Sequence, residues 1–570
     1  MAKKKNFIQK TGYFFEEIVR SKIVLQAVLV GLIAGILVVL FKLSINGLFN
    51  FIQTEISGFS FFKKLLIFPV ITTMGGLISG LLVFKIAPET RGSGIPYVKM
   101  TLARVGNMTR LRSILVKFFA GVAGIGTGLS LGREGPSVQL GAGSGALVGK
   151  LFNMNGTDKD KLIAAGAGSA IGATFNAPIA GTVFVLEELL QKFSSSLLFP
   201  VLVATVTAAS VARFFLGNNP SFQIPYFNNY MNESNIVVCI ILGFVAGILG
   251  VGFAKLIYMN NSLFAKMKHI PNWAKPAIAG FVVGIAGLFV PLILGSGNHG
   301  VDLLLEHKLS LIFILLIFIV KFFITPFCFG SGAAGGIFLP MLMLGAFLGY
   351  MMGLVSNFLG FYVNPVVIAL VGMGAFLSAV ARTPITAAVM VFEMTGGYNY
   401  ILPIMLSAAI ADLTAEKLNH KPIYSTLILK QSKDSEDAEM LSKVKAKVIM
   451  TENVQIFDAD MPIKEALAVM EQSGHSAFPV ADKRRRLIGI ITKSDIEDSL
   501  IQSNKDDIAV EKIMNPAPVF AYAETDLYTV YYRLHFNNTE WAIITDKKRF
   551  IQGIITRLDI HNFIEHSSEN

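Results

Sequence analysis

Long apolar stretches follow one another from about Ile23 as far as about Ala411. A helix needs about 20 mostly apolar residues to cross a bilayer. A water-soluble surface could not accommodate so many of these stretches, since 53% of the 570 residues are hydrophobic and only 15% are charged. The sequence therefore predicts a polytopic α-helical membrane protein. Several stretches, such as Leu162–Leu190 and Val366–Phe392, are interrupted by glycine and proline. Broken helices of this kind are typical of sites inside transporters.

The N-terminal segment, residues 1–22, is polar and opens with three lysines near the start. The apolar run that follows is too long for the core of a signal peptide and has no obvious cleavage site, so we expect a retained helix with a cytoplasmic leader. The net charge of +11 is explained better by basic cytoplasmic loops than by nucleic-acid binding. The two cysteines, Cys239 and Cys328, lie in apolar runs away from histidine clusters. We expect no disulfide framework and no metal site.

The apolar region contains an internal repeat. Glycines and prolines held in register over such a length indicate two structurally related halves, the usual construction of a secondary transporter. We expect the halves to be inverted, although no residue in the sequence shows the inversion. Six positions recur with a shift of 204, namely Gly132, Pro136, Leu140, Gly141, Ala142 and Gly145 as Gly336, Pro340, Leu344, Gly345, Ala346 and Gly349. Five recur with a shift of 206, namely Gly166, Gly168, Pro178, Ile179 and Glu187 as Gly372, Gly374, Pro384, Ile385 and Glu393.

From about Leu441 the glycine-rich apolar runs give way to amphipathic helices and short strands, which indicates a soluble α/β region. This region repeats at a spacing of 64, and each unit is predicted to run helix, strand, strand, helix. The repeated residues are Met450, Asp482, Gly489, Thr492, Asp495 and Ile496, which return as Met514, Asp546, Gly553, Thr556, Asp559 and Ile560. The predicted domains are an N-terminal segment 1–22, a transmembrane domain 23–430, a linker 431–445 and two repeated domains, 446–500 and 508–566.

Three glycine-proline segments indicate an anion site in the membrane region. A transported anion must also leave, so lysine or arginine would hold it too tightly. Backbone N–H groups at helix N-termini are milder donors, glycine allows close approach, and proline suits the first helical turn. Each segment alone is also a common turn motif. They are Gly92-Ser93-Gly94-Ile95-Pro96, Gly132-Arg133-Glu134-Gly135-Pro136 and Gly336-Ile337-Phe338-Leu339-Pro340.

Together these segments resemble the signature motifs of the CLC family of chloride channels and chloride/proton antiporters. A fourth segment, Lys421-Pro422-Ile423-Tyr424-Ser425, resembles the family's tyrosine-bearing segment at the end of the membrane domain. The resemblance covers essentially the whole chain. It implies that the hydroxyls of Ser93 and Tyr424 and the backbone N–H groups of Ile337 and Phe338 bind a central anion. From the residues alone, Ser93 and Tyr424 could instead cap helices.

The resemblance also implies that Glu134 is the gating glutamate, whose carboxylate competes with the anion for an outer site and leaves when it is protonated. A structural ion pair between Arg133 and Glu134 is the alternative interpretation. Chloride is the expected anion, because serine at position 93 goes with chloride in the family and proline goes with nitrate. The fluoride-exporting branch departs from the Gly-Ser-Gly-Ile-Pro pattern, which this chain keeps.

Glu188 decides between an exchanger and a passive channel. The resemblance makes it the internal proton-transfer glutamate of the exchangers, at a position where family channels commonly carry an apolar residue. Glu187 recurs as Glu393 and is expected to be structural, whereas the counterpart of Glu188 is Met394. We expect exchange, with a gated chloride channel as the alternative. A membrane enzyme is disfavoured because the membrane half has no metal-ligand cluster, nucleophile–base pair or cofactor loop.

The C-terminal repeat resembles tandem CBS domains, which often bind adenine nucleotides. The resemblance implies contacts from Thr492 and Thr556 to phosphate and from Asp495 and Asp559 to ribose hydroxyls, with ATP or a cyclic dinucleotide as the ligand. These residues could equally be helix caps. Transport itself is expected to require no cofactor. The family also implies a homodimer with a separate pathway in each subunit, and the compact tail suggests a bacterial plasma membrane protein with both termini cytoplasmic.

Overall fold

The computed structural model describes residues 22–102, 111–154, 156–191, 195–222, 224, 233–432, 436–503, 508–516, 518–536 and 539–568. Residues 1–21 of the predicted N-terminal segment lie outside this part of the chain. The fold divides into two compact units, with unit 1 ending at Tyr424 and unit 2 beginning at Ser425.

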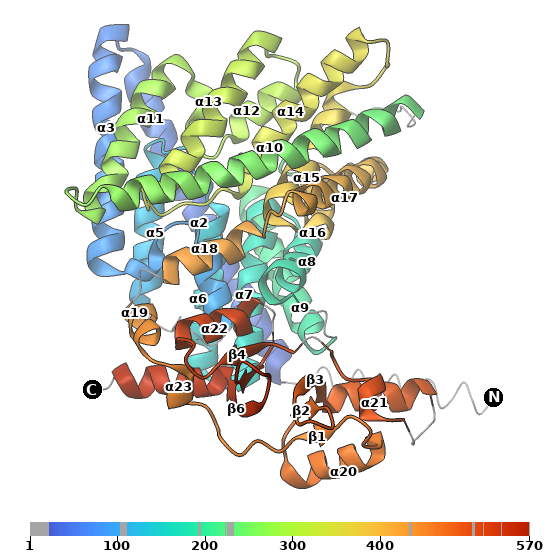
Figure 1. Cartoon of the computed structure of the whole chain (residues 1–570). Coiled ribbons are helices and arrows are strands. Elements are labelled where there is room, and N and C mark those ends of the chain that lie inside the picture. Colours follow the sequence, from blue (N-terminus) through green and yellow to red (C-terminus); the bar gives the residue numbers. More distant parts are fainter. Residues whose placement is uncertain are drawn as a thin grey trace. The chain divides into compact units, whose positions relative to one another are not determined.

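Unit 1 is helical (Figure 1). Its first half contains α2 (Lys22–Ser57), α3 (Phe61–Leu81), α4 (Ile95–Leu102), α5 (Leu111–Gly126), α6 (Glu134–Leu151), α7 (Gly156–Phe175), α8 (Pro178–Phe184), η3 (Val185–Leu190) and α9 (Ser195–Leu216). Its second half contains α10 (Glu233–Lys266), α11 (Lys275–Phe289), α12 (Asn298–Leu305), α13 (Leu311–Gly330), α14 (Phe338–Phe358), α15 (Pro365–Ala381), α16 (Pro384–Thr395) and α17 (Ile401–Lys417). The helix α18 (Ile423–Ser432) follows at the junction with unit 2.

Seven helical segments among the described residues are long and apolar enough to cross a membrane. They are Lys22–Ser57, Phe61–Ile86, Leu197–Leu216, Ile236–Lys266, Asn272–Phe289, Leu311–Gly330 and Phe338–Phe358. Two further apolar helices, Pro365–Ala381 and Pro384–Thr395, are shorter, as the interrupted apolar stretches predicted. The many-helix membrane fold is therefore confirmed.

The predicted helix breaks occur at equivalent places in the two halves. The backbone turns left-handed at Asn176 (φ 58°) between α7 and α8, and at Arg382 (φ 62°) between α15 and α16. Proline then begins the next helix in each half, at Pro178 and Pro384. Because proline has no N–H to satisfy, it is well suited to this first position.

A local two-fold relation joins the halves at the starts of α6 and α14. The N–H of Gly132 donates to the carbonyl of Gly336 (2.7 Å), and the N–H of Gly336 donates to the carbonyl of Gly132 (2.6 Å). This antiparallel exchange between equivalent residues places the N-termini of the two helices against each other. Inverted repeats that meet at a central site have this arrangement.

Glycine permits the closest helix contacts inside each half. A Cβ atom on Gly141 of α6 would lie 2.2 Å from the carbonyl oxygen of Gly166 in α7. The equivalent pair repeats the contact, since a Cβ on Gly345 of α14 would lie 2.2 Å from the carbonyl oxygen of Gly372 in α15. Small residues let membrane helices approach to this distance. The recurring glycines in the sequence thus mark recurring helix interfaces.

Unit 2 contains two similar α/β repeats, each with a three-stranded sheet. In each sheet a short first strand pairs in parallel with the middle strand, which pairs antiparallel with the last. The helix–strand–strand–helix order is confirmed, with one short strand added before it. The first repeat has β1 (Phe457–Asp458), α20 (Ile463–Ser473), β2 (Ala477–Ala481), β3 (Leu487–Thr492) and α21 (Lys493–Ser503). The second has β4 (Phe520–Tyr522), α22 (Leu527–Phe536), β5 (Trp541–Thr545), β6 (Ile551–Thr556) and α23 (Arg557–Ser568), and α19 (Glu436–Lys443) precedes both.

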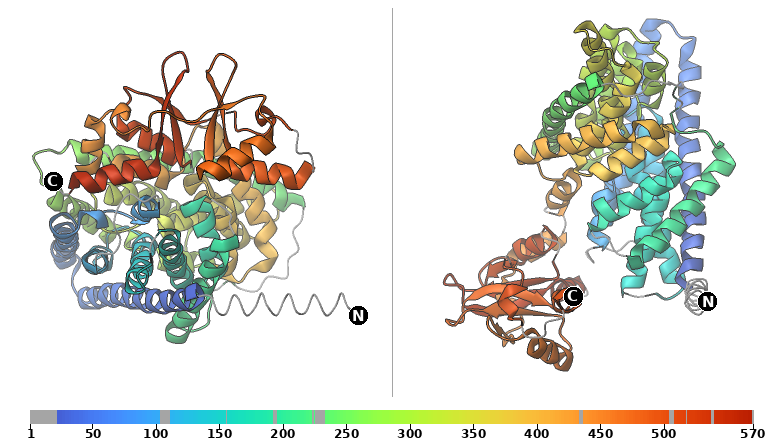
Figure 2. Two further views of the ribbon diagram at one scale, coloured as in Figure 1. Left: turned by 90° about the horizontal axis from the view of Figure 1, so that it is seen from below. Right: turned by 90° about the vertical axis from the view of Figure 1, so that its right-hand side faces the viewer.

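The two repeats of unit 2 interlock. Thr451, which precedes the sheet of the first repeat, exchanges backbone hydrogen bonds with Ile554 in the last strand of the second (2.9 and 3.1 Å). Asn515, which precedes the sheet of the second repeat, exchanges backbone hydrogen bonds with Ile490 in the last strand of the first (2.8 and 3.1 Å). Figure 2 shows the resulting pair of hairpins standing side by side within the unit. Each repeat therefore completes the other.

Candidate anion-binding site

Backbone hydrogen bonds tie the three glycine-proline segments together. The carbonyl of Gly92 accepts from the N–H of Gly335 (3.1 Å) and from Lys117 Nζ (2.7 Å). Gly92 and Gly94 have positive φ angles, 64° and 91°, so the loop around Ser93 has a conformation that glycine favours. Together with the exchange between Gly132 and Gly336, these bonds bring all three segments to one place in unit 1.

The side chain of Glu134, the first residue of α6, lies at the start of α14. Its Oε2 accepts from the N–H of Leu339 (3.4 Å), and its Oε1 has no hydrogen-bond partner among the described residues. Glu134 is fully buried. Glycine at position 132 makes this placement possible, because a Cβ there would lie 2.2 Å from Glu134 Oε2. Since the first N–H groups of a helix have no partner within it, the carboxylate occupies a natural anion site.

Arg133, the neighbour of Glu134, bonds to α2 and not to this carboxylate. Its guanidinium Nη1 donates to Asn46 Oδ1 of α2 (3.3 Å), and within the described part of the chain it forms no ion pair with Glu134. The structural ion pair considered from the sequence is therefore wrong. Glu134 is instead a buried carboxylate held by backbone N–H groups.

The hydroxyls of Ser93 and Tyr424 fit the role that the resemblance implies. Both side chains are fully buried, and neither hydroxyl has a hydrogen-bond partner among the described residues. Neither side chain therefore caps a helix. Ser93 Oγ lies against Gly135 of α6, where a Cβ would come within 2.2 Å of it. Buried hydroxyls nearly always have a partner, so this pair suits an acceptor supplied by a ligand.

The predicted backbone donors of the site lie at the start of α14. Ile337 is the N-cap residue of this helix and Phe338 is its first residue. Both residues are buried, at 0% and 1% exposure. N–H groups at these two positions have no acceptor within the helix and the helix dipole favours an anion in front of them. The donor set that the sequence predicted is thus two hydroxyls and a helix N-terminus.

Glu188 forms a buried ion pair that sequence reasoning missed. Lys99 Nζ of α4 lies 2.7 Å from Glu188 Oε1 in η3, and their side chains are only 3% and 1% exposed. Glu188 Oε2 has no hydrogen-bond partner among the described residues. Lys99 lies on α4, the helix that follows the Ser93 loop, so the ion pair joins Glu188 to the region of the candidate site. The available signal was a lysine inside the first glycine-proline helix, six residues after Ser93.

Glu187, the neighbour of Glu188, is a structural residue as predicted. Its carboxylate accepts from the N–H groups of Ile385 (3.1 Å) and Thr386 (2.6 Å) at the start of α16. Glu393 accepts in the same way from Ile179 (3.1 Å) and Ala180 (2.6 Å) at the start of α8. Each half thus caps a helix of the other, which explains why this glutamate recurs.

Two buried lysines support symmetry-related loops, and the sequence reasoning missed both. Lys117 donates to the carbonyls of Thr90 (2.8 Å) and Gly92 (2.7 Å), and Lys321 donates to those of Ile293 (2.8 Å) and Gly295 (2.8 Å). The loop held by Lys321 reads Gly295-Ser296-Gly297 and so repeats Gly92-Ser93-Gly94. A search for this second Gly-Ser-Gly would have found the pair. Among the described residues no His, Cys, Asp and Glu cluster could hold a metal.

Comparison with known proteins now decides the family. The family described as "Voltage gated chloride channel" matches residues 75–416, which include most of the site, and the "CBS domain" family matches residues 444–501 and 510–566. The chain belongs to the CLC family. Its membrane region is 34% identical, over 415 residues, to a protein of Vibrio cholerae named H(+)/Cl(-) exchange transporter ClcA, and the match covers 70% of this chain and 88% of that protein.

A Salmonella arizonae protein of the same name is 33% identical to this CLC protein over 432 residues, with 74% and 91% of the two chains covered. Among solved structures, a slow cyanobacterial Cl-/H+ antiporter has a TM-score of 0.67 at 29% identity, covering 73% of this chain and 99% of that one. A eukaryotic CLC transporter has a TM-score of 0.65 at 20% identity and covers 94% of this chain and 97% of its own. This last likeness shows the fold alone, but it extends over the tail.

The Thr–Asp pairs of the CBS repeats of this CLC protein cap helices. Asp495 Oδ2 accepts from the N–H and the hydroxyl of Thr492, both at 2.7 Å. Asp559 Oδ2 accepts in the same way from Thr556, both at 2.8 Å. The hydrogen bonds expected of a helix cap are therefore present in both repeats. Because each pair uses one carboxylate oxygen for these bonds, a nucleotide contact stays a prediction.

Proposed function

We propose that this CLC protein is a secondary active chloride/proton antiporter. One observation carries the proposal: the buried carboxylate of Glu134 accepts from the backbone N–H of Leu339 at the start of α14, and the hydroxyls of Ser93 and Tyr424 are buried without a partner among the described residues. A carboxylate and a chloride ion compete for the same hydrogen-bond donors. A protonatable side chain that fills an anion site can couple the two ions.

The proposed cycle follows from the charge of Glu134. As a carboxylate it occupies the outer N–H groups and excludes chloride from them. Once a proton adds to an oxygen of Glu134, the neutral side chain loses its attraction to the helix N-terminus and leaves. Chloride then takes its place, while Ser93, Tyr424 and the N–H groups of Ile337 and Phe338 bind the central anion. The proton returns by a route of its own.

Glu188 supports exchange over passive conduction in this proposal. It is a second buried carboxylate, it pairs with Lys99 on the helix that follows the Ser93 loop, and it lies outside the glycine-proline segments. It could therefore take protons to or from Glu134 without crossing the anion path. The relatives named as H(+)/Cl(-) exchange transporters agree with this choice. A gated chloride channel of the same architecture is the alternative.

Paired flux measurements test the proposal. In liposomes that contain the purified protein, a chloride gradient should drive protons in the opposite direction. We expect Glu134→Gln to retain chloride movement and to abolish proton movement. The glutamine side chain is neutral, so it does not compete with chloride as a carboxylate does, and it cannot bind and release the transported proton. Glu306→Gln, on an exposed side chain, is the control and should keep both fluxes. Chloride movement without proton movement in the unmodified protein would make it a channel.

Ser93 is the proposed determinant of anion choice. We expect Ser93→Pro to shift preference from chloride toward nitrate, since proline removes both the hydroxyl and the backbone N–H. Competition between the two anions for uptake measures this preference. Bromide diffraction gives an independent test, with a halide expected beside Ser93, Phe338 and Tyr424. Unchanged selectivity together with no halide at that place would contradict the assignment.

The finer organisation belongs to the same proposal. We infer a homodimer in a bacterial plasma membrane, with both termini cytoplasmic, and a transmembrane domain at residues 23–430 followed by a linker at 431–445. CBS domains at 446–500 and 508–566 would bind an adenine nucleotide, ATP or a cyclic dinucleotide, through Thr492, Asp495, Thr556 and Asp559. Calorimetric titration of the full-length protein with each nucleotide tests this, and no heat from any of them would leave these residues as helix caps.

A further inference from the structure

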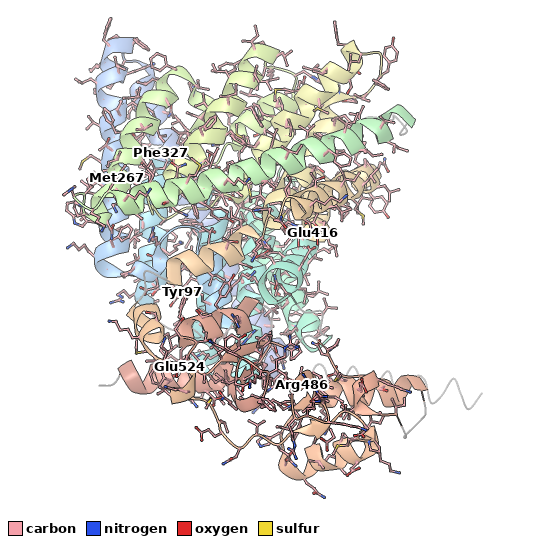
Figure 3. All side chains as sticks on the ribbon, viewed as in Figure 1. Tyr97, Met267, Phe327, Glu416, Arg486 and Glu524 are labelled. Atoms are coloured by element: carbon pink, nitrogen blue, oxygen red, sulfur yellow. The ribbon has the colours of Figure 1, made fainter. Side chains whose placement is uncertain are left out.

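Two strongly basic turns lie together at one edge of unit 2. The first, Asp482–Arg486, joins β2 to β3, and the second, Asp546–Phe550, joins β5 to β6. Arg486 and Phe550 pair as an antiparallel bridge, and the N–H of Leu487 donates to the carbonyl of Arg549 (2.9 Å). The sequence places these turns 64 residues apart and the fold makes them neighbours. Figure 2 shows the two hairpins that carry them, and Arg486 is labelled in Figure 3.

Each turn uses its aspartate to fix the backbone. Asp482 Oδ1 accepts from the N–H groups of Arg484 and Arg486, both at 2.9 Å. Asp546 Oδ1 accepts from those of Lys548 (2.8 Å) and Phe550 (2.9 Å). The N–H of Arg486 also lowers the pKa of Asp482 from its ordinary value. The acidic residues are therefore committed to the turns themselves.

Most basic side chains of the turns remain available to a partner, although Arg549 lies over the ring of Phe520, 5.4 Å from its centroid. Seven basic and two acidic residues give the two turns a net charge of +5. Arg486 pairs with Asp482 (Nη2–Oδ2 2.8 Å). The six others form no ion pair with any described residue, and all seven are exposed. The six are Lys483, Arg484, Arg485, Lys547, Lys548 and Arg549.

An exposed aromatic ring lies among these charges. Phe550, the last residue of the second turn, is 41% exposed. Its bridge partner in the first turn is Arg486. Basic residues around an exposed aromatic side chain are typical of protein surfaces that bind anionic membranes, where the cations meet phosphate headgroups and the ring enters the interface. Unit 2 also follows directly on unit 1 in the chain, which joins them between Tyr424 and Ser425, so unit 2 belongs to a protein that is already attached to a membrane.

We propose that the two basic turns form a docking surface for the anionic phospholipid headgroups of a bilayer. The surface consists of Lys483, Arg484, Arg485, Arg486, Lys547, Lys548, Arg549 and Phe550. It is separate from the Thr–Asp pairs, and it does not depend on the transport reaction proposed above. Soluble phosphate compounds share the headgroup chemistry, so the experiment separates the two sources.

Fluorescence of the full-length protein in lipid nanodiscs tests the surface. Phe550→Trp places a reporter at the centre of the turns, and a brominated phosphatidylcholine quenches it only on contact with the bilayer. We expect quenching with discs that contain phosphatidylglycerol and little with phosphatidylcholine alone, after subtraction of the signal from the native tryptophans. High salt should remove it, because exposed charges are screened.

Matched variants assign the effect to the turns. The double variant Arg484→Gln with Lys548→Gln is made in the Phe550→Trp background. It should lower the equilibrium constant for docking of the turns on the bilayer, as measured by quenching, by about fivefold for each removed charge. Lys447→Gln with Lys512→Gln removes two exposed basic residues elsewhere in unit 2 and should leave it unchanged. Equal quenching with and without phosphatidylglycerol, or no quenching in either kind of disc, would overturn the proposal. So would a fluorescence response to inorganic phosphate or ATP in phosphatidylcholine discs, since the surface would then serve a soluble anion.

Discussion

At the residue scale, the buried pair of Lys99 and Glu188 is the feature with the clearest consequences. Two charges taken out of water are stable only while they are paired, and removal of one partner typically costs about 3–5 kcal/mol. The pair joins α4, which carries the loop of Ser93, to η3. Lys99 thus positions the proposed proton-transfer group relative to the anion site.

Lys99→Met alone should therefore lower the stability of the protein more than removal of both charges does. We expect this variant to lower the thermal unfolding midpoint of the detergent-solubilised protein, and Lys99→Met with Glu188→Gln to restore part of the loss, because no unpaired charge stays buried. Lys99→Arg, which keeps the cation, should retain most proton flux, whereas Lys99→Met should slow it at least about tenfold, the equivalent of 1.4 kcal/mol. Fully additive effects of the two substitutions on stability would show that the pair is not coupled.

Individual site residues could be predicted when a local motif contained them. Ser93, Glu134, Ile337 and Phe338 all lie in glycine-proline segments that are readable in the sequence. The partner of Glu188 could not be predicted in this way, because Lys99 is 89 residues away and only the fold brings the two together. The same limit applies to Arg133, whose partner Asn46 lies on α2, 87 residues away.

At the scale of elements, the helices of the two halves cap each other. Glu187 from η3 satisfies the start of α16, and Glu393 from α16 satisfies the start of α8. The recurrence of this glutamate predicted a structural role, but its target, the N-terminus of a helix in the other half, emerges only from the two-fold relation. Breaks at Asn176 and Arg382 were readable from the prolines that follow them.

Glu187→Gln and Glu393→Gln should each destabilise unit 1. Each glutamate accepts with both oxygens, so glutamine would turn an NH₂ group toward a backbone N–H and leave that partly buried donor without its partner, at a cost of about 1 kcal/mol. A lower thermal unfolding midpoint with an unchanged ratio of proton to chloride flux is the expected result. Glu306→Gln, on the surface, controls for the loss of a charge. A changed flux ratio would instead give Glu187 or Glu393 a part in transport.

At the scale of the whole molecule, internal repetition is the principle that sequence and structure share. Shifts of 204 and 206 in the membrane region and of 64 in the tail are visible in the sequence. How the copies meet was not visible, because backbone hydrogen bonds such as those between Gly132 and Gly336 involve no side chain. In each unit, the contact between the copies creates a feature that neither copy has alone, namely the proposed anion site in unit 1 and the pair of basic turns in unit 2.

This principle makes a prediction about unit 2, where each repeat should be unable to fold without the other. Gly553 of β6 packs on Met450 of the first repeat, and a Cβ atom on Gly553 would lie 2.9 Å from the carbonyl oxygen of Thr451. Gly553→Val should therefore loosen both repeats at once, since that carbonyl belongs to the backbone exchange between them. Gln552→Ala is the matched control, because Gln552 is exposed on the opposite face of the same strand.

Hydrogen exchange of the full-length protein distinguishes the possibilities. With Gly553→Val we expect faster exchange in β2 and β3 of the first repeat as well as in β5 and β6 of the second, and with Gln552→Ala no change in either. Faster exchange confined to the second repeat would mean that the repeats fold independently. Cooperative loss of both would show that the exchanged segments, Thr451 with Ile554 and Asn515 with Ile490, make the tail a single folding unit, because neither sheet keeps its edge pairing once the other opens.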